Sequence, residues 1–233
     1  MAKGGKDEEL ILLDHWVSLF SMRVRVALAE KGITNYECKE ENITILGGKS
    51  PMLPEMNPVH KQIPVLIHNG KPVFESLIIV EYIDEVLMGK SGSKLLPSDP
   101  YRRSQGRFWA HFVDTKVYPP SWNIWRTKGK TQEKAKADFI ESLKALEDEL
   151  GEKCYFGGEK FGFVDVALIP FYCWFYTYEV CGNFSIMAVC PKIVAWGKRC
   201  VQREAMLKSL PDIHKVSELI LELRSIQLAK QEW

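Results

Sequence analysis

Long hydrophobic runs are missing from this 233-residue sequence. The longest predominantly apolar stretch, residues 166–178, has 13 residues, whereas a membrane-spanning helix needs roughly 20. The segment MAKGGKDEE at the start is rich in charge, and the apolar run at 10–13 is too short for the core of a secretory signal. We therefore expect a cytoplasmic protein that does not associate with a membrane.

An excess of one charge is also missing, since 31 basic residues stand against 30 acidic ones. No basic stripe with interleaved aromatic residues stands out, which argues against nucleic acid as a partner. The six cysteines form no CxxC pair, and no histidine lies at a zinc-ligand spacing, so we expect no metal site. A disulfide framework is not expected in the cytoplasm, and most of these thiols should be buried in the core.

The first part of the chain alternates short strand and helix patterns. Strands are predicted at 9–14 and 36–39, and helices at 22–31 and 51–56. A hairpin at 63–76 turns at Asn69-Gly70, the strongest short hairpin signal. The helix that follows, to residue 87, is apolar nearly all round and is expected to be buried between two layers. This order predicts an α/β domain with a small mixed sheet.

The rest of the chain shows no further strand pattern. Helices are predicted at 101–125, 131–150, 165–180, 191–203 and 212–228, and Pro119-Pro120 should bend the first of them. Residues 89–100, rich in Gly, Ser and Pro, have the composition of a linker. The expected organisation is an α/β domain at 1–88, a linker at 89–100 and an all-helical domain at 101–233.

The segment 15–25, HWVSLFSMRVR, runs from the end of a strand into a helix, with Ser18 just before the first turn. Free N–H groups and the helix dipole favour negative charge there, and a serine hydroxyl can donate to a thiolate. Simple capping of the helix by Ser18 or Ser21 explains the same residues equally well. His15 is a rival catalytic candidate, although a single histidine beside a strand end is more often structural.

Further features of the first domain suit a ligand that carries an α-amino acid group. Ile63-Pro64 opens an apolar strand, and a cis bond there would present the Ile63 backbone to an extended peptide, although an ordinary trans proline is the simpler interpretation. Ser76 is predicted to cap the next helix, whose N–H groups suit a carboxylate while Glu75 suits an ammonium group. Lys49 is either a solvated lysine or the partner of a second carboxylate.

Two features stand out in the helical domain. Gly162 and Asp165 have the spacing of a capping box, which we interpret as structural. An aromatic set comprises Tyr118, Trp122, Trp125 and Trp174. Core packing is the default role of such residues, and an apolar substrate pocket is the alternative if they face the first domain.

Together these features resemble the tau class of plant glutathione transferases. The similarity covers nearly the whole chain, through LILLDHWVSLF, MNPVHKQIPVLIHNGKPVFESLIIVEYIDE, LLPSDPYRRSQGRFWAHFVD, FGGEKFGFVDVALIPFYCWF and CPKIVAWGKRC. The Ile-Pro pair before the hairpin and the Glu-Ser pair after it are specific in combination.

The resemblance implies a thioredoxin-like domain that binds glutathione, a helical domain that completes the electrophile site, a homodimer and a cis bond at Pro64. The implied enzyme conjugates the glutathione thiolate to hydrophobic electrophiles, with a peroxidase side activity and no cofactor beyond glutathione as co-substrate. Ser18 is then the catalytic hydroxyl. The implied glutathione-binding residues are Ser18, Lys49, Gln62, Ile63, Pro64, Glu75 and Ser76. The implied acceptor-binding residues are His15, Leu19, Phe20, Tyr118, Trp122, Trp125 and Trp174.

The chain departs from the family pattern at a few positions. Leu19 stands in place of a proline beside the catalytic group, His15 in place of an aromatic residue, and Gln62 in place of a lysine. The loop before Lys49 is longer than is usual. Each change affects the surroundings of the implied site and leaves its central residues in place.

Two other functions stay open. A thiol oxidoreductase on the same fold would need a cysteine at the position of Ser18, and Cys38 is the only cysteine of the first domain. A non-catalytic carrier of hydrophobic small molecules would use the same aromatic residues. Turnover of glutathione with an aromatic halide distinguishes an enzyme from a carrier.

Overall fold

The computed structural model describes residues 9–42, 48–87 and 94–229, and it divides into two compact units, 1–93 and 94–233. Most of the loop before Lys49 and part of the expected linker lie outside the described residues. The first unit is α/β and the second is helical, so the predicted fold class is confirmed.

The first unit is built on a four-stranded mixed sheet in the order β2-β1-β3-β4. Its strands are β1 (Leu10–Asp14), β2 (Glu37–Glu40), β3 (Val65–His68) and β4 (Lys71–Phe74). β1 pairs parallel with β2 and antiparallel with β3, which pairs antiparallel with β4. The hairpin turn has φ of 51° at Asn69 and 75° at Gly70, the left-handed pair that a two-residue turn of this kind requires.

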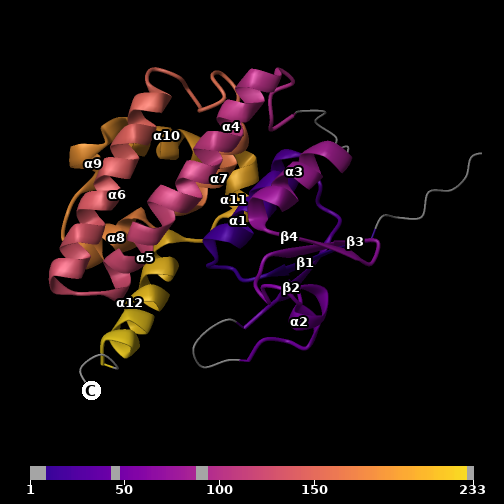
Figure 1. The fold of residues 1–233 in the computed structure, drawn as a ribbon, viewed down its shortest axis with the longest axis horizontal. Coiled ribbons are helices and arrows are strands. Elements are labelled where there is room, and N and C mark those ends of the chain that lie inside the picture. The colour runs from indigo at the N-terminus through magenta and orange to yellow at the C-terminus, as the bar shows by residue number, and fades with distance from the viewer. Residues whose placement is uncertain (1–8, 43–47, 88–93, 230–233) are drawn as a thin grey trace, which may run out of the picture. The chain divides into compact units, whose positions relative to one another are not determined.

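Helices cover both faces of this sheet. α1 (Leu19–Glu30) and α3 (Ser76–Val86) pack together on one face, and α2 (Met52–Met56) lies on the other (Figure 1). Successive strand residues point to opposite faces. Leu13 and Val65 therefore pack with Leu53 of α2, whereas Leu12 is buried on the opposite face.

Three predictions about these helices were wrong in detail. α1 begins at Leu19 rather than at 22, because Ser18 is its N-cap. Ser76 does not cap α3: it is the first helical residue, and the N-cap is Glu75, which makes no side-chain capping bond. α3 is also not buried all round, since Ile78 is 58% and Val86 48% exposed. An apolar sequence shows which residues can be buried, but the neighbouring elements decide which face is covered.

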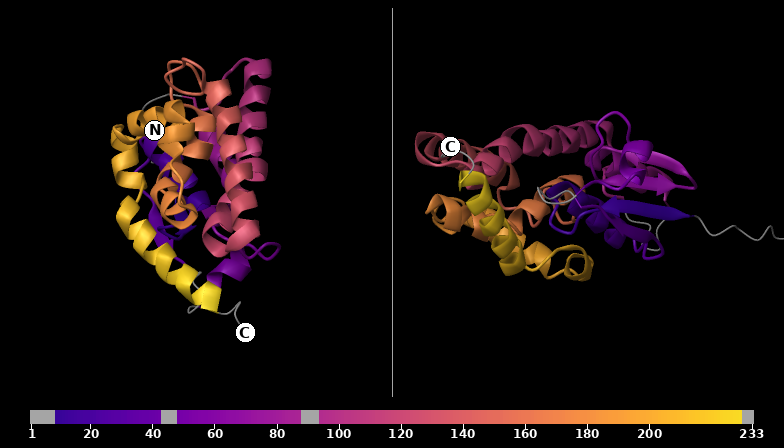
Figure 2. Two further views of the ribbon diagram at one scale, coloured as in Figure 1. Left: turned by 90° about the vertical axis from the view of Figure 1, so that its left-hand side faces the viewer. Right: turned by 90° about the horizontal axis from the view of Figure 1, so that it is seen from below.

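The second unit consists of helices and connecting segments. The helices are α4 (Pro100–Phe112), α5 (Tyr118–Arg126), α6 (Gly129–Leu150), α7 (Phe163–Tyr172), α8 (Phe175–Gly182), α9 (Ile186–Val189), α10 (Pro191–Val201), α11 (Glu204–Ser209) and α12 (Ile213–Ala229). α12, in yellow, runs along one side of this bundle and packs on α5 and α8 (Figure 2).

The structure corrects two of the predicted helices. The helix predicted at 165–180 is two helices, α7 and α8, and at the break between them Cys173 and Trp174 donate to carbonyls only three residues back. The long helix predicted at 101–125 is interrupted by a π-helical segment, Val113–Val117, directly before α5 with its Pro119 and Pro120. The short helices α9 and α11 were not predicted as separate elements.

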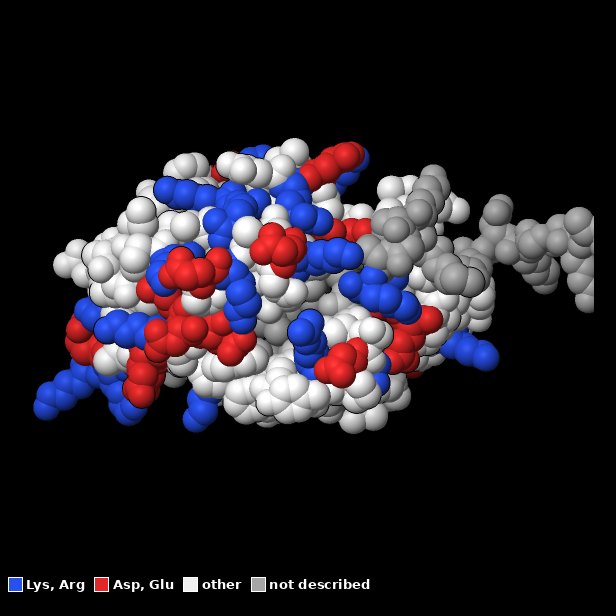
Figure 3. Space-filling view, turned by 90° about the horizontal axis from the view of Figure 1, so that it is seen from above, with Lys and Arg blue, Asp and Glu red and all other residues white. Residues whose placement is uncertain are grey.

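The surface in Figure 3 mixes the two charge signs: Lys and Arg side chains lie among Asp and Glu, with uncharged areas beside them. None of the helices in the described ranges is both long and apolar enough to cross a membrane. Where described residues of opposite charge lie so close together, their fields largely offset each other.

Candidate active site

Ser18 stands at the N-terminus of α1 with extended backbone angles, φ −67° and ψ 120°. Its Oγ accepts a hydrogen bond from the Ser21 N–H at 3.3 Å, so Ser18 does cap the helix. A hydroxyl that accepts one bond still has its own proton to donate. The side chain is half-buried, whereas Ser21 is fully buried. Capping and donation to a bound anion are therefore compatible roles for Ser18.

His15 has a structural partner. Its Nδ1 lies 2.6 Å from Glu40 Oε1, and the same oxygen accepts from the Trp16 N–H at 3.1 Å. The imidazole is buried and joins the end of β1 to β2. This contact favours the structural interpretation of His15 over a catalytic one. Leu19, also expected to contact the acceptor, is buried as well.

The turn before β3 is shaped by Asn57, which is almost completely buried. Its side chain donates to the Gln62 carbonyl at 3.0 Å and accepts from the His60 N–H at 3.1 Å. The Ile63–Pro64 peptide bond directly after this turn is cis, as the family resemblance implied. Gln62 itself is exposed. Sequence reasoning missed Asn57, because its role depends on contacts across the turn.

Lys49 reaches this turn. Its Nζ donates to the Lys61 carbonyl at 2.7 Å, which places the ammonium group beside the segment that leads to Pro64. The neighbouring Ser50 donates through its N–H and its Oγ to the buried Glu41 carboxylate. Glu41 thus anchors the start of the segment that follows Lys49, a contact that the sequence did not indicate.

Glu75 and Ser76 lie at the start of α3. Glu75 has φ of 69°, which is unusual for a residue with a side chain. Its Oε1 lies 2.6 Å from His60 Nδ1, and both side chains are about half exposed. Ser76 is buried, and its Oγ accepts from the Arg23 guanidinium of α1 at 3.1 Å.

These contacts bring most of the predicted glutathione-binding residues of the first unit together. Lys49 touches the 57–62 turn, this turn touches Glu75 through His60, and Ser76 touches α1 through Arg23. Arg23 is buried and lies over the half-buried ring of Phe20, 5.2 Å from its centroid. The arrangement combines the N-termini of two helices with an ammonium and a carboxylate, which suits a ligand with both charge signs.

The aromatic set of the second unit is contiguous. Ring centroids lie 5.9 Å apart for Tyr118–Trp122, 5.0 Å for Trp122–Trp125 and 6.4 Å for Trp125–Trp174. Trp125 and Trp174 are buried, whereas Trp122 is 37% exposed. The Arg126 guanidinium lies 4.6 Å from the Trp122 ring centroid, a cation–π contact that the sequence analysis missed. Packing explains the two buried rings, whereas Trp122 keeps part of its surface exposed.

The cysteines give little support to thiol chemistry by the protein itself. All six are free, but only Cys173, Cys190 and Cys200 are buried, so the prediction that most are buried was wrong. Cys38 donates to Asp14 at 3.5 Å; partial burial and this carboxylate raise the pKa of Cys38 to about 11. A thiol with that pKa is a poor nucleophile at neutral pH. Among the described residues, no cluster of His, Cys, Asp and Glu has the form of a metal site.

Both units match known family profiles. Residues 8–85 match the profile described as glutathione S-transferase, N-terminal domain, and residues 108–204 match glutathione S-transferase, C-terminal domain. A curated tobacco relative (Nicotiana tabacum), described as probable glutathione S-transferase parC, is 62% identical over 218 residues, which are 94% of this chain and 96% of the relative.

Solved structures agree with these matches. A rice glutathione transferase, OsGSTU1, crystallised in complex with glutathione, is 44% identical with a TM-score of 0.87, over 95% of this chain and 98% of that one. A tau-class glutathione S-transferase from mango is 40% identical with a TM-score of 0.84, over 92% of this chain and 98% of that one. The similarity extends over both units.

Proposed function

The chain belongs to the tau class of the glutathione S-transferase family, and from this premise we propose that it conjugates the glutathione thiolate to hydrophobic electrophiles, with Ser18 stabilising the thiolate. The observation that carries the proposal is the half-buried Ser18 hydroxyl at the N-terminus of α1, whose proton remains available for donation. The serine does not attack the electrophile. It holds the sulfur anion that attacks.

The free-energy requirement is modest. A cysteine-like thiol has a pKa of about 8.5 and is only a few per cent ionised at neutral pH. Lowering that pKa by about two units requires about 2.7 kcal/mol of preference for the anion. A hydrogen bond to a charged group contributes about 1.5–3 kcal/mol, and a helix N-terminus adds up to about 1 kcal/mol. Ser18 and α1 together are therefore sufficient.

We assign the peptide portion of glutathione to the residues around β3 and α3. Glu75 would pair with the α-ammonium group, and Ser76 with the first N–H groups of α3 would hold the α-carboxylate. The Ile63 backbone beside Pro64 would pair with the extended peptide, with Gln62 at its edge. Lys49 would neutralise the second carboxylate. The rice relative, which was crystallised with glutathione, supports glutathione as the ligand.

The electrophile is assigned to the aromatic residues. Tyr118, Trp122, Trp125 and Trp174 of the second unit favour flat apolar acceptors, because aromatic faces stack on planar groups. Since Trp125 and Trp174 are buried, Trp122 and Tyr118 are the residues that would contact the acceptor directly. We carry the acceptor-binding roles of His15, Leu19 and Phe20 over from the family resemblance.

The proposal also covers the localisation, the oligomeric state and a second activity of the protein. We infer a cytoplasmic homodimer with a peroxidase side activity, in which hydroperoxides replace the electrophile. The exposed apolar side chains Ile78 and Val86 of α3, and Tyr101 and Phe108 of α4, support association of two copies. The carrier function is the second candidate, because apolar aromatic surface also binds molecules that are not turned over.

A turnover assay with glutathione and 1-chloro-2,4-dinitrobenzene tests the proposal. Ser18→Ala should lower the rate about ten- to 150-fold at neutral pH, because one hydrogen bond to an anion is lost. Part of the rate should return as the pH approaches 8.5, the ordinary pKa of such a thiol. Ser21→Ala, the matched hydroxyl deletion one turn along α1, should leave the rate nearly unchanged.

Thermal melting of both variants controls for the loss of the helix cap, which costs about 1 kcal/mol. Equal rates for Ser18→Ala and the unmodified protein at pH 6.5 would leave Ser18 as a helix cap only. Binding of 1-chloro-2,4-dinitrobenzene without any turnover would favour the carrier function instead.

A further inference from the structure

The half-buried Arg224 of α12 caps the C-terminal end of α5. One terminal nitrogen of its guanidinium donates to the Trp125 carbonyl, to the Ile124 carbonyl at 3.3 Å and to the Thr127 carbonyl at 3.2 Å. The last carbonyls of a helix have no partner within the helix, and the helix dipole favours positive charge beside them. The end of α5 is therefore completed by a residue 100 positions after Ile124.

A second side chain binds the same end of α5. Gln132 of α6 donates through Nε2 to the Ile124 carbonyl at 2.7 Å and to the Cys181 carbonyl of α8 at 2.8 Å. α12 packs on both α5 and α8. The last turn of α5 is thus fixed to α12 by Arg224 and to α6 and α8 by Gln132. We call these two side chains the α5 clamp.

The beginning of α5 gives this helix little support of its own. Pro119 and Pro120 carry no N–H, so they cannot continue the hydrogen-bond ladder of the π-helical segment Val113–Val117 that precedes them. α5 has nine residues, whereas isolated helices need about 12–15 residues to be even marginally stable. The position of α5 therefore depends on tertiary contacts, and the α5 clamp supplies polar ones at its far end.

The clamped turn carries aromatic side chains that the proposed function assigns to the acceptor. The ring centroids of Trp122 and Trp125 lie 5.0 Å apart, and the Arg126 guanidinium lies over both rings, at 4.6 and 5.4 Å. Arg224 binds the backbone carbonyl of Trp125 itself. A shift of this turn would therefore move Trp125 and, through the ring contact, the partly exposed Trp122.

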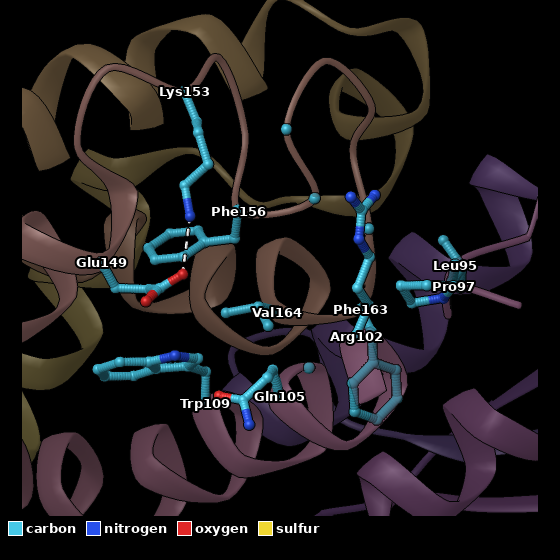
Figure 4. A pocket seen from close by; sticks show the side chains of 14 residues that line it. Leu95, Pro97, Arg102, Gln105, Trp109, Glu149, Lys153, Phe156, Phe163 and Val164 are labelled. Carbon is cyan, nitrogen blue, oxygen red and sulfur yellow. Dashed lines mark hydrogen bonds and ion pairs between the residues drawn. The ribbon is translucent and has the colours of Figure 1, made fainter. Parts of the chain in front are cut away.

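The α5 clamp is separate from the cavity of the second unit. That cavity, of about 370 Å³, lies beside Trp109, between α4, the end of α6 and residues 156–164 (Figure 4). None of the described residues that line it belongs to α5, α8 or α12. A change at the clamp therefore acts on the aromatic residues of α5 and not on the cavity.

We propose that Arg224 is a positioning residue for the acceptor: by fixing the last turn of α5, it determines where Trp122 presents its ring. This inference rests on the proposed function, because it concerns the same acceptor site. Loss of the clamp lowers the affinity for a bulky acceptor, whereas the glutathione-binding residues of the first unit keep their contacts. Acceptor preference is then set in part from α12, by a side chain that acts through α5.

Steady-state kinetics of Arg224→Met test this inference with glutathione and two aromatic halides, 1-chloro-2,4-dinitrobenzene and the bulkier 4-chloro-7-nitrobenzofurazan. KM for the bulkier halide should rise about three- to tenfold, within the range that contacts outside a binding site transmit. KM for glutathione should stay within about twofold, because its binding residues are untouched. Arg224→Lys keeps the charge but not the planar fork, and it should show a smaller rise. Lys215→Met, at an exposed position of the same helix, is the matched control and should change neither KM.

A double-mutant cycle distinguishes positioning from a general loss of stability. If Arg224 acts through Trp122, adding Arg224→Met to Trp122→Ala should change the acceptor KM by less than about twofold. Fully additive effects, equal rises of both KM values, or an unchanged acceptor KM would overturn the proposal. Should Arg224→Met not fold in thermal melting, Arg224→Lys and Gln132→Met are compared in its place, and the same split between the two KM values is expected.

The test does not depend on the outcome for Ser18. If the protein binds the halides without turnover, quenching of tryptophan fluorescence measures their dissociation constants, and Arg224→Met should raise that of the bulkier halide by the same factor. Failure of the proposed function is seen as absent turnover, whereas failure of this inference is seen as acceptor binding that does not respond to Arg224.

Discussion

Asp165 offers the sharpest test of how the second unit is held together. Its carboxylate is fully buried and accepts from the Phe156 N–H, the Gly162 N–H and the Trp196 indole N–H, at 2.7–3.0 Å. Replacement by alanine leaves these three donors buried without an acceptor. Each costs about 1–3 kcal/mol, so the expected loss is about 3–9 kcal/mol. That is a large part of the about 5–15 kcal/mol by which a domain is stable.

The dependence on pH gives the prediction a second measurable feature. Burial raises the pKa of Asp165 from 3.8 to about 6, against the opposing effect of its hydrogen bonds. The folded state therefore holds the proton more tightly than the unfolded chain does. The contribution of Asp165 to the free energy of unfolding is fully present below about pH 4. It falls by about 3 kcal/mol as the pH rises through 6. The alanine variant lacks this dependence, so its deficit should be largest near pH 4.

Urea denaturation and thermal melting between pH 4 and 7.5 measure both effects. At neutral pH, Asp165→Ala should lower the melting temperature by at least about 6 °C, given about 2–4 °C for each kcal/mol in a chain of this size. Asp138→Ala, which removes an exposed ion pair with Lys134, should change it little. At neutral pH, a melting temperature within 2 °C of that of the unmodified protein corresponds to a stability loss of about 1 kcal/mol or less. That result would refute the role of Asp165. A deficit that is constant across this pH range would refute its raised pKa.

Three other predictions follow from the proposed site. Lys49→Ala should raise KM for glutathione about two- to fivefold with little change in kcat, because an exposed charge binds the ground state and the transition state equally. Lys71→Ala is the control. An unchanged KM for Lys49→Ala would mean that Lys49 contacts Lys61 alone. Trp122→Ala should weaken bulky aromatic halides more than small ones in steady-state assays, and equal losses would identify Trp122 as a packing residue. Sedimentation at micromolar concentration should give twice the 26.7 kDa chain mass, and a single 26.7 kDa species would contradict the dimer.

The parts of the fold that the sequence predicted well carry local signals. Asn69-Gly70 specifies a tight hairpin by its backbone preferences alone. Ser18 lies where a polar residue meets an apolar helical pattern, which is typical of an N-cap. Gly162 and Asp165 have the spacing of a capping box, and Asp165 does accept from the Gly162 N–H. In each case neighbouring residues are sufficient to determine the structure.

The parts that the sequence did not predict depend on distant partners. Ser76 precedes a helical pattern as a cap would, yet its hydroxyl is engaged by Arg23, 53 positions earlier in the chain. His60 resembles an ordinary turn residue until its partner Glu75, 15 positions later, is known. The cavity beside Trp109 combines α4 with a loop about 50 residues later, so no window of the sequence contains it. Tertiary contacts create these features.

Glu75 shows a conflict between folding and binding at one position. A residue with a side chain at φ of 69° costs about 1–3 kcal/mol, and glycine would adopt the same backbone without that cost. Glycine would also remove the carboxylate beside His60, and with it the proposed partner of the ligand's ammonium group. The more stable chain would therefore be the weaker binder. Stabilising this protein by relieving backbone strain should begin at positions other than Glu75.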